Sequence, residues 1–260
     1  MSGTNAPKPF LDSPVPLVMA HRGFSRDGLE NSLVAFNAAL DLGCRYVETD
    51  LNTTADGVAL AFHDSTLERT TDRKGIIAQL PYSEVKKARI GGREPIPTLE
   101  ELIAALPGAR FNIDVKDGGS VAPLAAAIEN HGLHERVCVA SFSEKRRRAV
   151  LSRLSRPVAS SPGIRLLAAY FLMESWLPRA LLLRLMQDVD VLQIPTHYRG
   201  VKIVTPATVR RAHGLGLKVH IWTINEPAHM ERLLDLGVDG IMTDRADLLV
   251  DVMRRRGLLA

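Results

Sequence analysis

Cysteine and aromatic residues are scarce in this sequence of 260 residues. The two cysteines, Cys44 and Cys138, exclude a disulfide framework and a Cys-rich metal site, and both are expected to be small buried residues. Aromatic residues account for only 5% of the chain. The core is therefore expected to consist mainly of Leu, Val, Ile and Ala.

Long uninterrupted apolar runs are also missing. The first 20 residues contain Pro and polar residues but no basic start followed by an apolar run, so no secretory signal is expected. The longest apolar stretch, Ile164–Met186, is interrupted by charged residues and by Pro178, which argues against a membrane span. We expect a cytoplasmic protein with no stable membrane insertion.

The Ile164–Met186 stretch has two interpretations. A helix in the outer ring of a barrel needs an apolar face toward the core, and this is the interpretation we favour. The alternative is an amphipathic surface helix that meets lipid.

The net charge of +4 is not gathered into one stripe, as it would be in a strong nucleic-acid binder. The basic clusters Lys145–Arg148, Arg210-Arg211 and Arg254–Arg256 are far apart and alternate with apolar residues in helical patterns. They are predicted to be solvated helix faces. A nucleic-acid partner is not expected, whereas an anionic substrate would suit this charge.

Short β-rich runs alternate with amphipathic stretches along most of the chain, a pattern typical of a parallel sheet. Eight such units in about 250 residues match an α/β fold of the (β/α)8 type, a TIM barrel. We expect an irregular leader at 1–15 and a single barrel domain at 16–260. The predicted strands are Leu17–Ala20, Tyr46–Leu51, Phe111–Val115, Val137–Phe142, Pro157–Ser160, Val191–Ile194, Lys218–Thr223 and Gly240–Thr243. The predicted helices include Ser32–Leu42, Thr98–Ala105, Val121–Asn130, Ala168–Leu185 and Glu226–Leu236.

One connection, after the second strand, is longer than the others. Ala55-Asp56-Gly57 has the composition of a hairpin turn, and Val58–His63 is a further β-rich run. Residues 64–97 then form an insertion. We expect an extra hairpin and a small cap at the barrel mouth.

Polar residues gather where the predicted strands end, which is where a barrel carries its catalytic residues. The first three strands end in His21-Arg22-Gly23, Glu48-Thr49-Asp50 and Asp114-Val115-Lys116. The sixth and seventh strands carry Gln193 and Trp222. Gln193 is predicted to contact the substrate.

Glu48 and Asp50 are two residues apart on a strand, so both carboxylates are expected to project into the barrel. Asp114 and Lys116 have the same spacing. Burying these charges without partners would cost several kcal/mol each. A hard divalent cation, Mg²⁺ or Ca²⁺, would resolve the conflict and is the hypothesis we favour. The alternative is a layer of ion pairs in which Lys116 and Arg22 neutralise the acids.

His21 and His63 lie at strand ends beside this predicted metal site and are suited to proton transfer near neutral pH. Phosphodiester cleavage needs a base for the attacking oxygen and an acid for the leaving one. Arg22 and Lys116 are predicted to hold the phosphate oxygens. Gly23 is predicted to let the backbone turn close to the ligand.

Together these motifs resemble the glycerophosphodiester phosphodiesterase family, and the resemblance extends in order from about residue 17 to 250. The runs that carry it are His21-Arg22-Gly23, Glu30-Asn31-Ser32, Glu48-Thr49-Asp50, Asp56-Gly57-Val58, His63-Asp64 followed by Leu67 and Arg69, Asp114-Val115-Lys116, Trp222-Thr223-Ile224-Asn225 and Gly237–Asp244.

The resemblance implies a barrel fold, a divalent metal, and hydrolysis of glycerophosphodiesters to sn-glycerol 3-phosphate and an alcohol. It also implies that His21 and His63 are the acid/base pair and that Arg22 and Lys116 bind the phosphate. The family's usual chemistry has the glycerol hydroxyl attack phosphorus to form a cyclic phosphate. Direct attack by water is the alternative.

The same resemblance implies that Glu48 and Asp50 are metal ligands and that Trp222 lines the glycerol pocket. Glu30 belongs to the Glu-Asn element of the family and is assigned to the metal or the glycerol. The sequence departs from the family at Asp114, where Glu is more common. Asp114 is the third expected ligand, and its shorter side chain puts the coordination and the identity of the metal in doubt.

The predicted function is therefore a metal-dependent hydrolase of glycerol and lipid metabolism with a small glycerophosphodiester substrate. Two alternatives stay open. A lysophospholipase D-type enzyme would use the same site on an acyl-bearing substrate. A non-catalytic barrel would bind a phosphorylated metabolite or a protein partner. A homo-oligomer is compatible with each of them.

Overall fold

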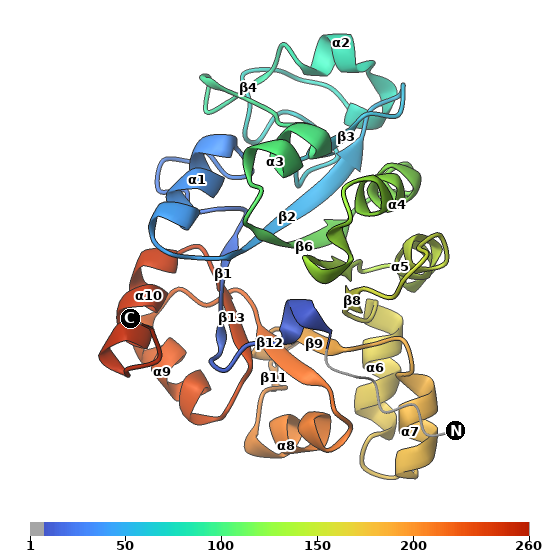
Figure 1. Cartoon of the computed structure of the whole chain (residues 1–260), viewed down its shortest axis with the longest axis vertical. Helices are drawn as coiled ribbons and strands as arrows, with labels where there is room; N and C mark the ends of the chain where they lie inside the picture. The colour runs from blue at the N-terminus through green and yellow to red at the C-terminus, as the bar shows by residue number, and fades with distance from the viewer. Residues whose placement is uncertain (1–7, 260) are drawn as a thin grey trace.

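Eight parallel strands surrounded by helices form a nearly closed barrel in the computed structural model, which describes residues 8–259 (Figure 1). Adjacent strands follow the order β8–β7–β6–β2–β1–β13–β12–β9. Between the two end strands, the backbone N–H of Asp190 donates to the carbonyl of Ser160 over 3.0 Å. The predicted TIM barrel is confirmed. The strand bounds are β1 Leu17–His21, β2 Tyr46–Thr53, β6 Arg110–Val115, β7 Val137–Ala140, β8 Ala159–Ser160, β9 Val191–Ile194, β12 Lys218–Ile221 and β13 Gly240–Thr243.

All eight predicted strands are present, and their parallel register brings the polar strand ends together. His21 on β1 lies opposite Glu48 on β2, and Asp50 on β2 lies opposite Asp114 on β6. The fifth strand is two residues shorter than predicted, because β8 begins at Ala159 and not at Pro157. Pro157 lies outside the strand because proline has no N–H to donate to the hydrogen bonds between strands.

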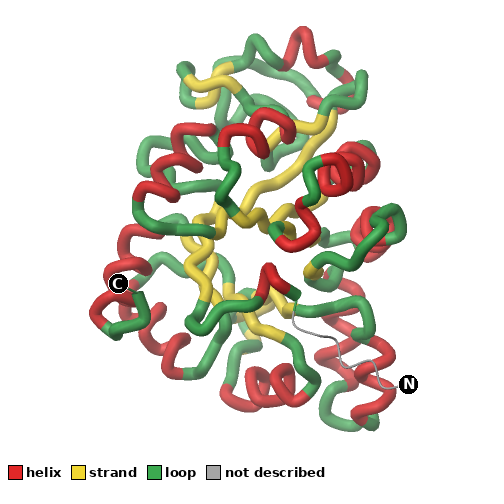
Figure 2. The backbone as a smooth tube through the Cα atoms, in the orientation of Figure 1, coloured by secondary structure: helices red, strands yellow, loops and turns green. Residues whose placement is uncertain are grey.

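Helices cover the outside of the barrel (Figure 2). Four of them, α1, α3, α5 and α8, begin at a side-chain cap. Ser32 caps α1 by accepting a hydrogen bond from the N–H of Ala35. Thr98 and Glu101 form a reciprocal capping box at the start of α3. The helix bounds are α1 Leu33–Asp41, α3 Leu99–Ala105, α4 Val121–Asn130, α5 Glu144–Leu151, α6 Ile164–Met173, α7 Arg179–Leu185, α8 Pro206–Gly214, α9 Pro227–Asp235 and α10 Ala246–Arg255, with a 3-10 turn η3 at Leu133–Glu135.

The predicted single helix Ala168–Leu185 is wrong, because the segment forms two helices, α6 and α7, separated at 174–178. Pro178 explains the break: its ring excludes the helical conformation of the preceding residue, and it has no N–H. Leu166, Tyr170 and Leu182 are buried against the barrel, as expected of outer-ring helices. Other apolar side chains of the segment are exposed.

The connection after β2 forms the predicted hairpin and cap, seen at the top of Figure 1. Strand β3 (Ala59–Ala61) is antiparallel to β2, with Leu51 opposite Ala61. The insertion has its own apolar cluster, which includes Leu67, Ile77 and Ile90. Its short elements are η2 Ile77–Gln79, α2 Tyr82–Val85, β4 Arg89–Ile90 and β5 Glu94–Pro95.

The inside of the barrel is filled by apolar side chains below the polar strand ends. Met19, Cys138 and Met242 belong to this cluster. The 3-10 helix η1 (Pro9–Leu11) closes the bottom of the barrel, because Phe10 packs edge-on against Tyr46 with ring centroids 5.2 Å apart. Of the predicted leader, residues 1–7 lie outside the described residues. Both cysteines are buried as predicted.

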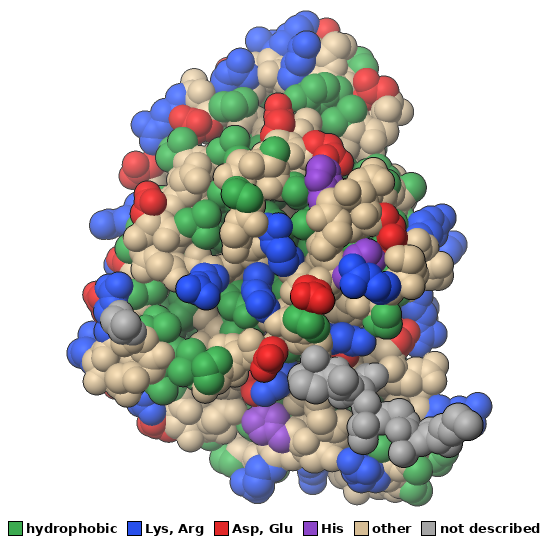
Figure 3. All heavy atoms as spheres, viewed as in Figure 1, with side chains coloured by type: hydrophobic (Ala, Val, Ile, Leu, Met, Phe, Trp, Pro, Cys, Tyr) green, Lys and Arg blue, Asp and Glu red, His purple; other side chains and the backbone are tan. Residues whose placement is uncertain are grey.

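The predicted basic clusters lie on α5, α8 and α10. Arg147 on α5 is an exception to the predicted solvation: it is fully buried and pairs with Glu144 and Asp188. On the face shown in Figure 3, Lys and Arg side chains are scattered among other types. Within residues 8–259, no helix is long and apolar enough to cross a bilayer.

Candidate active site

A cavity of about 340 Å³ opens at the carboxyl ends of the barrel strands. It has a polar end built from the strand ends and an apolar wall built largely from α6. Nine of the ten predicted site residues line it, namely His21, Arg22, Glu48, Asp50, His63, Asp114, Lys116, Gln193 and Trp222. The tenth, Glu30, lies behind Arg22 and bonds to its guanidinium.

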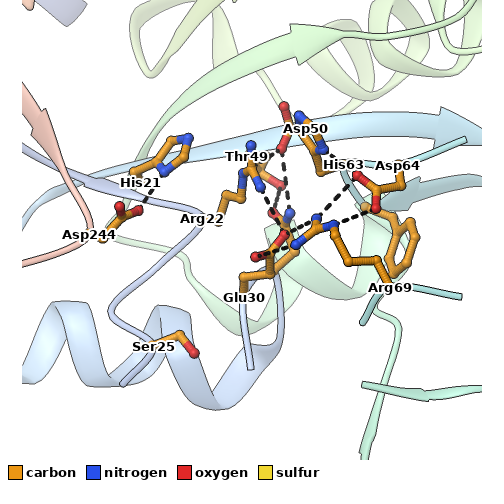
Figure 4. Close-up of polar contacts among 12 residues, drawn as sticks. His21, Arg22, Ser25, Glu30, Thr49, Asp50, His63, Asp64, Arg69 and Asp244 are labelled. Atoms are coloured by element: carbon orange, nitrogen blue, oxygen red, sulfur yellow. Dashed lines mark hydrogen bonds and ion pairs between the residues drawn. The ribbon is translucent and has the colours of Figure 1, made fainter. Parts of the chain in front are cut away.

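His21 ends β1 and is held by an aspartate whose role the sequence did not indicate. Its Nδ1 lies 2.6 Å from Oδ1 of Asp244, which follows β13 (Figure 4). The other Asp244 oxygen accepts from the amide of Asn225 over 2.9 Å. Burial raises the pKa of Asp244, but the hydrogen bonds from His21 and Asn225 outweigh it and hold this pKa below its usual range. An ionised Asp244 only accepts, so Nδ1 of His21 is the protonated nitrogen and Nε2 is left for the substrate.

The pKa of His21 is raised above its ordinary value. Burial works to lower it, but the charge of Glu48 and the hydrogen bond with Asp244 together exceed that effect. Glu48 approaches the other ring nitrogen, with Oε2 3.8 Å from Nε2. His21 is thus prepared to carry a proton near neutral pH.

His63 lies after β3 and has a carboxylate partner of its own. Its Nδ1 is 2.5 Å from Oδ1 of Asp64, the next residue. Asn52 fixes this loop, because its amide donates to the carbonyls of Phe62, His63 and Asp64 over 3.0 Å each. Both histidines are therefore oriented by an aspartate. Asp64 belongs to the motif of His63, whereas nothing in the sequence pattern of Asn52 indicated its contribution.

The guanidinium of Arg22 forms ion pairs with two acidic residues. Its Nη1 bonds to Glu30 over 2.9 Å, and its Nε lies 3.2 Å from Oδ2 of Asp50. The residue has a φ of 54°, in the left-handed region that side chains other than glycine rarely adopt. Such strain is typical of functional sites. The following Gly23 has a φ of 82°, as the predicted turn of the backbone requires, and a Cβ there would lie 2.7 Å from the backbone of Ala35 on α1. The glycine therefore also permits close packing of α1, while its approach to a ligand stays a prediction.

Lys116, after β6, bonds to both strand-end aspartates. Its Nζ is 2.9 Å from Oδ1 of Asp50 and 2.6 Å from Oδ2 of Asp114. Burial works to lower the pKa of Lys116, but the two carboxylates raise it above its ordinary value. The ammonium therefore stays charged at the floor of the pocket.

Glu48 is a buried carboxylate in a crowded acidic environment. Its Oε2 accepts from the backbone N–H of Arg22 over 3.1 Å. Burial, and after it the charge of Asp50, raise the pKa of Glu48 to about 8. The pKa of Asp114 is also raised, by burial first, and its Oδ1 is buried without a hydrogen-bond partner.

The raised pKa values of Glu48 and Asp114 and the unpartnered Oδ1 of Asp114 fit a divalent cation. A hard cation would compensate the repulsion among the carboxylates and bind the unpartnered oxygen. In residues 8–259, no three His, Cys, Asp or Glu side chains are arranged to hold an ion. Instead, the two carboxylate oxygens of Asp50 form ion pairs with Arg22 and Lys116. A bound ion would compete with these two cations for the same carboxylates.

Glu30 links Arg22 to the residues around His63. Besides Arg22, it accepts from the Nη1 and Nη2 atoms of Arg69, over 3.1 Å and 2.6 Å. Arg69 also reaches Asp64, with its Nε 2.5 Å from Oδ2 (Figure 4). The chain of contacts therefore runs from the phosphate-binding candidate Arg22 to the partner of His63.

Asn31, the neighbour of Glu30 in its motif, is buried and positions Asp50. Its amide lies 3.5 Å from Oδ2 of Asp50, and its Oδ1 accepts from the hydroxyl of Thr49 over 2.7 Å. Asn31 has a φ of 60°, which asparagine tolerates better than most residues. This role was not predicted, although the Glu-Asn motif itself was noted.

Trp222 and Gln193 lie further into the cavity. Gln193 donates to Oδ1 of Asn112 over 2.7 Å, across the inside of the barrel. The Trp222 ring meets that of Phe142 at a centroid distance of 6.2 Å. From there the wall becomes apolar, with Leu167 and Phe171 of α6. The cavity thus joins a charged end to an apolar one.

Comparison with known proteins gives a consistent result. Residues 21–248 match the Glycerophosphoryl diester phosphodiesterase family. A protein of Mycobacterium tuberculosis named as a probable glycerophosphodiester phosphodiesterase 2 is 45% identical over 259 residues, covering 99% of this chain and 98% of its own. A glycerophosphodiester phosphodiesterase of Caldanaerobacter subterraneus is 32% identical, covering 93% of this chain and 99% of its own.

Solved structures have the same fold. A phosphodiesterase of Oleispira antarctica, in complex with the product sn-glycerol-3-phosphate, superposes with a TM-score of 0.77 at 25% identity, covering 92% of this chain and 97% of its own. A glycerophosphodiester phosphodiesterase of Agrobacterium tumefaciens also has a TM-score of 0.77, at 24% identity, covering 92% of this chain and all of its own.

Proposed function

The chain belongs to the glycerophosphoryl diester phosphodiesterase family, and from this membership we propose that it hydrolyses glycerophosphodiesters to sn-glycerol 3-phosphate and an alcohol. One observation carries the proposal: two histidines, each oriented by an aspartate, line the same polar cavity as an arginine and a lysine. Such a site can hold a phosphodiester and transfer protons to and from its oxygens.

Arg22 and Lys116 are the proposed phosphate ligands. The planar guanidinium suits two oxygens of a phosphate, and the ammonium adds a point charge. Both cations now pair with Asp50, so they are already held at the polar end by fixed anions. A phosphate that enters this end would compete with Asp50 for two cations whose side chains are already in place.

His21 and His63 are the proposed acid and base. Each has its Nδ1 fixed by an aspartate, so each presents Nε2 for proton transfer. One removes a proton from the attacking oxygen and the other protonates the leaving oxygen. We propose that His21, whose pKa is raised by the charge of Glu48 and by the hydrogen bond with Asp244, begins the cycle protonated, as the acid.

The proposed cofactor is Mg²⁺ or Ca²⁺. Glu48, Asp50 and Asp114 are its proposed ligands, and the ion would compete with Arg22 and Lys116 for Asp50. Because Glu30 bonds to both Arg22 and Arg69, we propose that it positions Arg22. When bound, such an ion supplies charge stabilisation to phosphoryl oxygens. Trp222 and Gln193 are proposed to contact the glycerol half of the substrate, since both line the cavity.

A second candidate function, lysophospholipase D-type hydrolysis, is favoured by the apolar wall of the same cavity. Phe142, whose ring centre lies 5.5 Å from Nζ of Lys116, adjoins the charged end, and Leu167 and Phe171 of α6 add further apolar lining. An acyl chain on the substrate would bury its surface there, whereas glycerophosphocholine has no such group.

The test is a panel of glycerophosphodiesters and lysophospholipids, scored for release of glycerol 3-phosphate or of the free alcohol. We expect turnover of the glycerophosphodiesters and its loss in both His21→Ala and His63→Ala, with circular dichroism unchanged. His131→Ala is the matched control, because His131 is exposed and pairs with Glu100 outside the cavity. Normal turnover in either active-site variant would refute the assigned roles. Preferential turnover of lysophosphatidylcholine would establish the second candidate.

A further inference from the structure

Most of the exposed large apolar side chains belong to the part of the chain that includes the apolar wall of the cavity. Within residues 8–259, ten large apolar side chains are exposed, and all but Val34 and Ile76 lie at Phe142 or between 164 and 201. Soluble proteins rarely gather exposed apolar residues in one region unless the region binds something. The residues concerned are Phe142, Ile164, Leu172, Trp176, Leu181, Leu183, Tyr198 and Val201.

One arm of this region is a stripe along α6 and the residues that follow it. Ile164, Ala168, Leu172 and Trp176 recur every four residues and are all exposed. We call these four residues the α6 stripe. Ile164 and Ala168 line the cavity, whereas Leu172 and Trp176 continue beyond it with 75% and 67% of their surface exposed. The stripe therefore leads from the mouth of the cavity onto the open surface.

The second arm is the hairpin of β10 (His197–Tyr198) and β11 (Val201–Lys202). Tyr198 lies opposite Val201, and both are exposed. Tyr198 also lines the cavity, so the hairpin and the α6 stripe flank the same opening. The guanidinium of Arg199 lies 5.6 Å from the centre of the Tyr198 ring.

Charge on this region has one sign. Between residues 162 and 204, every exposed charged side chain is basic: Arg165, Arg179, Arg184, Arg199 and Lys202. The acidic residues there are less exposed, and two of them are already paired, Glu174 with Arg211 and Asp188 with Arg147. The region thus presents apolar and basic groups without exposed anions.

We propose that the α6 stripe and the β10–β11 hairpin dock this protein onto a bilayer that contains anionic lipids, with the cavity mouth toward the membrane. Tryptophan, tyrosine and aliphatic side chains enter the boundary between headgroups and acyl chains, and basic residues beside them pair with anionic headgroups. This is peripheral docking, consistent with the finding that no described helix can span a bilayer. It places the cavity where a substrate with a lipid-embedded part could enter.

The test is co-sedimentation of the protein with vesicles of phosphatidylcholine alone or of phosphatidylcholine and phosphatidylglycerol in equal parts. We expect binding to the anionic vesicles that weakens with salt. Leu172→Ser combined with Trp176→Ser should weaken it roughly tenfold, because about 1.5 kcal/mol of apolar insertion is lost. Arg199→Gln combined with Lys202→Gln should weaken it about fivefold for each charge removed.

Matched controls exist on α1 and in the insertion, both of which lie away from α6 and α7 (Figure 1). Val34→Ser with Ile76→Ser removes exposed apolar residues, and Lys74→Gln with Lys86→Gln removes exposed charges. Neither pair should alter vesicle binding. A blue shift of tryptophan emission on anionic vesicles should disappear in Trp176→Phe, since Trp222 lies in the cavity.

Three outcomes would overturn the proposal: no binding to anionic vesicles, equal loss in the control pairs, or a concentration-dependent dimer that the Leu172→Ser/Trp176→Ser variant abolishes without any vesicle binding. The last outcome would assign the face to a second copy of the chain. The same variant should hydrolyse soluble glycerophosphocholine at the normal rate, since neither residue lines the cavity. Vesicle binding without hydrolysis would refute only the proposed function.

Discussion

Nδ1 of His21 lies 2.6 Å from Oδ1 of Asp244, although 223 residues separate the two in the sequence. The contact forms because β1 and β13 are neighbours in the barrel, with Ala20 opposite Thr243. It fixes which ring nitrogen carries the proton and raises the pKa of His21 against the opposing effect of burial. The partner of a catalytic candidate is thus supplied by closure of the barrel.

Asp244→Asn should therefore impair proton transfer without unfolding the protein. Loss of the negative charge lowers the pKa of His21, so the limb of the pH–rate profile assigned to His21 should move to lower pH, whether His21 acts as acid or base. We expect kcat/KM to fall by roughly 10²-fold. The measurement is a pH profile with glycerophosphocholine, and the control is Asp247→Asn, which removes a carboxylate that pairs with Arg245. An unshifted profile would show that Asp244 does not tune His21.

Removal of divalent ions should abolish activity, and added Mg²⁺ or Ca²⁺ should restore it. The ion should also raise the melting temperature of the chelator-treated protein by a few degrees, because it binds the folded state only. Asp50→Asn should eliminate this thermal shift, whereas the surface variant Asp251→Asn should retain it. Full activity in excess EDTA would remove the metal from the mechanism.

Gly23→Ala should destabilise the fold by about 2–4 kcal/mol, because a positive φ and a backbone clash act together. Gly23 has a φ of 82°, and an added Cβ would meet the backbone of Ala35 at 2.7 Å. Gly57→Ala is the matched control, since Gly57 has a φ of 88° with nothing within 4 Å. It should cost only about 1 kcal/mol. Urea denaturation measures both, and equal losses would show that packing against α1 contributes nothing.

His220 should make the protein less stable in acid. Its ring is buried near the bottom of the barrel, neither ring nitrogen has a hydrogen-bond partner within residues 8–259, and burial lowers its pKa from 6.5 to about 4. Between these values the unfolded chain binds a proton that the folded protein does not, so the free energy of unfolding falls as pH decreases through this window. The contribution is about 2 kcal/mol between pH 7 and pH 5.

Urea denaturation at the two pH values checks this prediction. His220→Leu should lose less stability than the wild type on acidification, whereas His131→Leu, at the surface, should behave like the wild type. An unchanged pH dependence in His220→Leu would contradict the assignment.

The barrel and most of the site could be predicted from local patterns in the amino-acid sequence. Period-two and helical hydrophobic patterns are local properties, so the eight strands and helices such as Val121–Asn130 follow from them directly. Glu48 and Asp50 share a face for the same reason, since alternate residues of a strand point the same way. Parallel strands bring their carboxyl ends to one edge, which accounts for the gathering of eight of the nine predicted residues around one cavity. The ninth, His63, is brought there by the antiparallel strand β3.

The pairing of these charges, in contrast, depends on how distant parts of the chain meet in the folded protein. Arg22 and Lys116 both reach Asp50, Glu30 is shared between Arg22 and Arg69, and Arg147 is buried in spite of its basic neighbours. No sequence pattern specifies such partners, because they depend on strand register and on the folding of the insertion over the barrel mouth. The exposed stripe from α6 to Trp176 has the same origin: composition made the segment apolar, and the barrel surface decided which side chains it left uncovered.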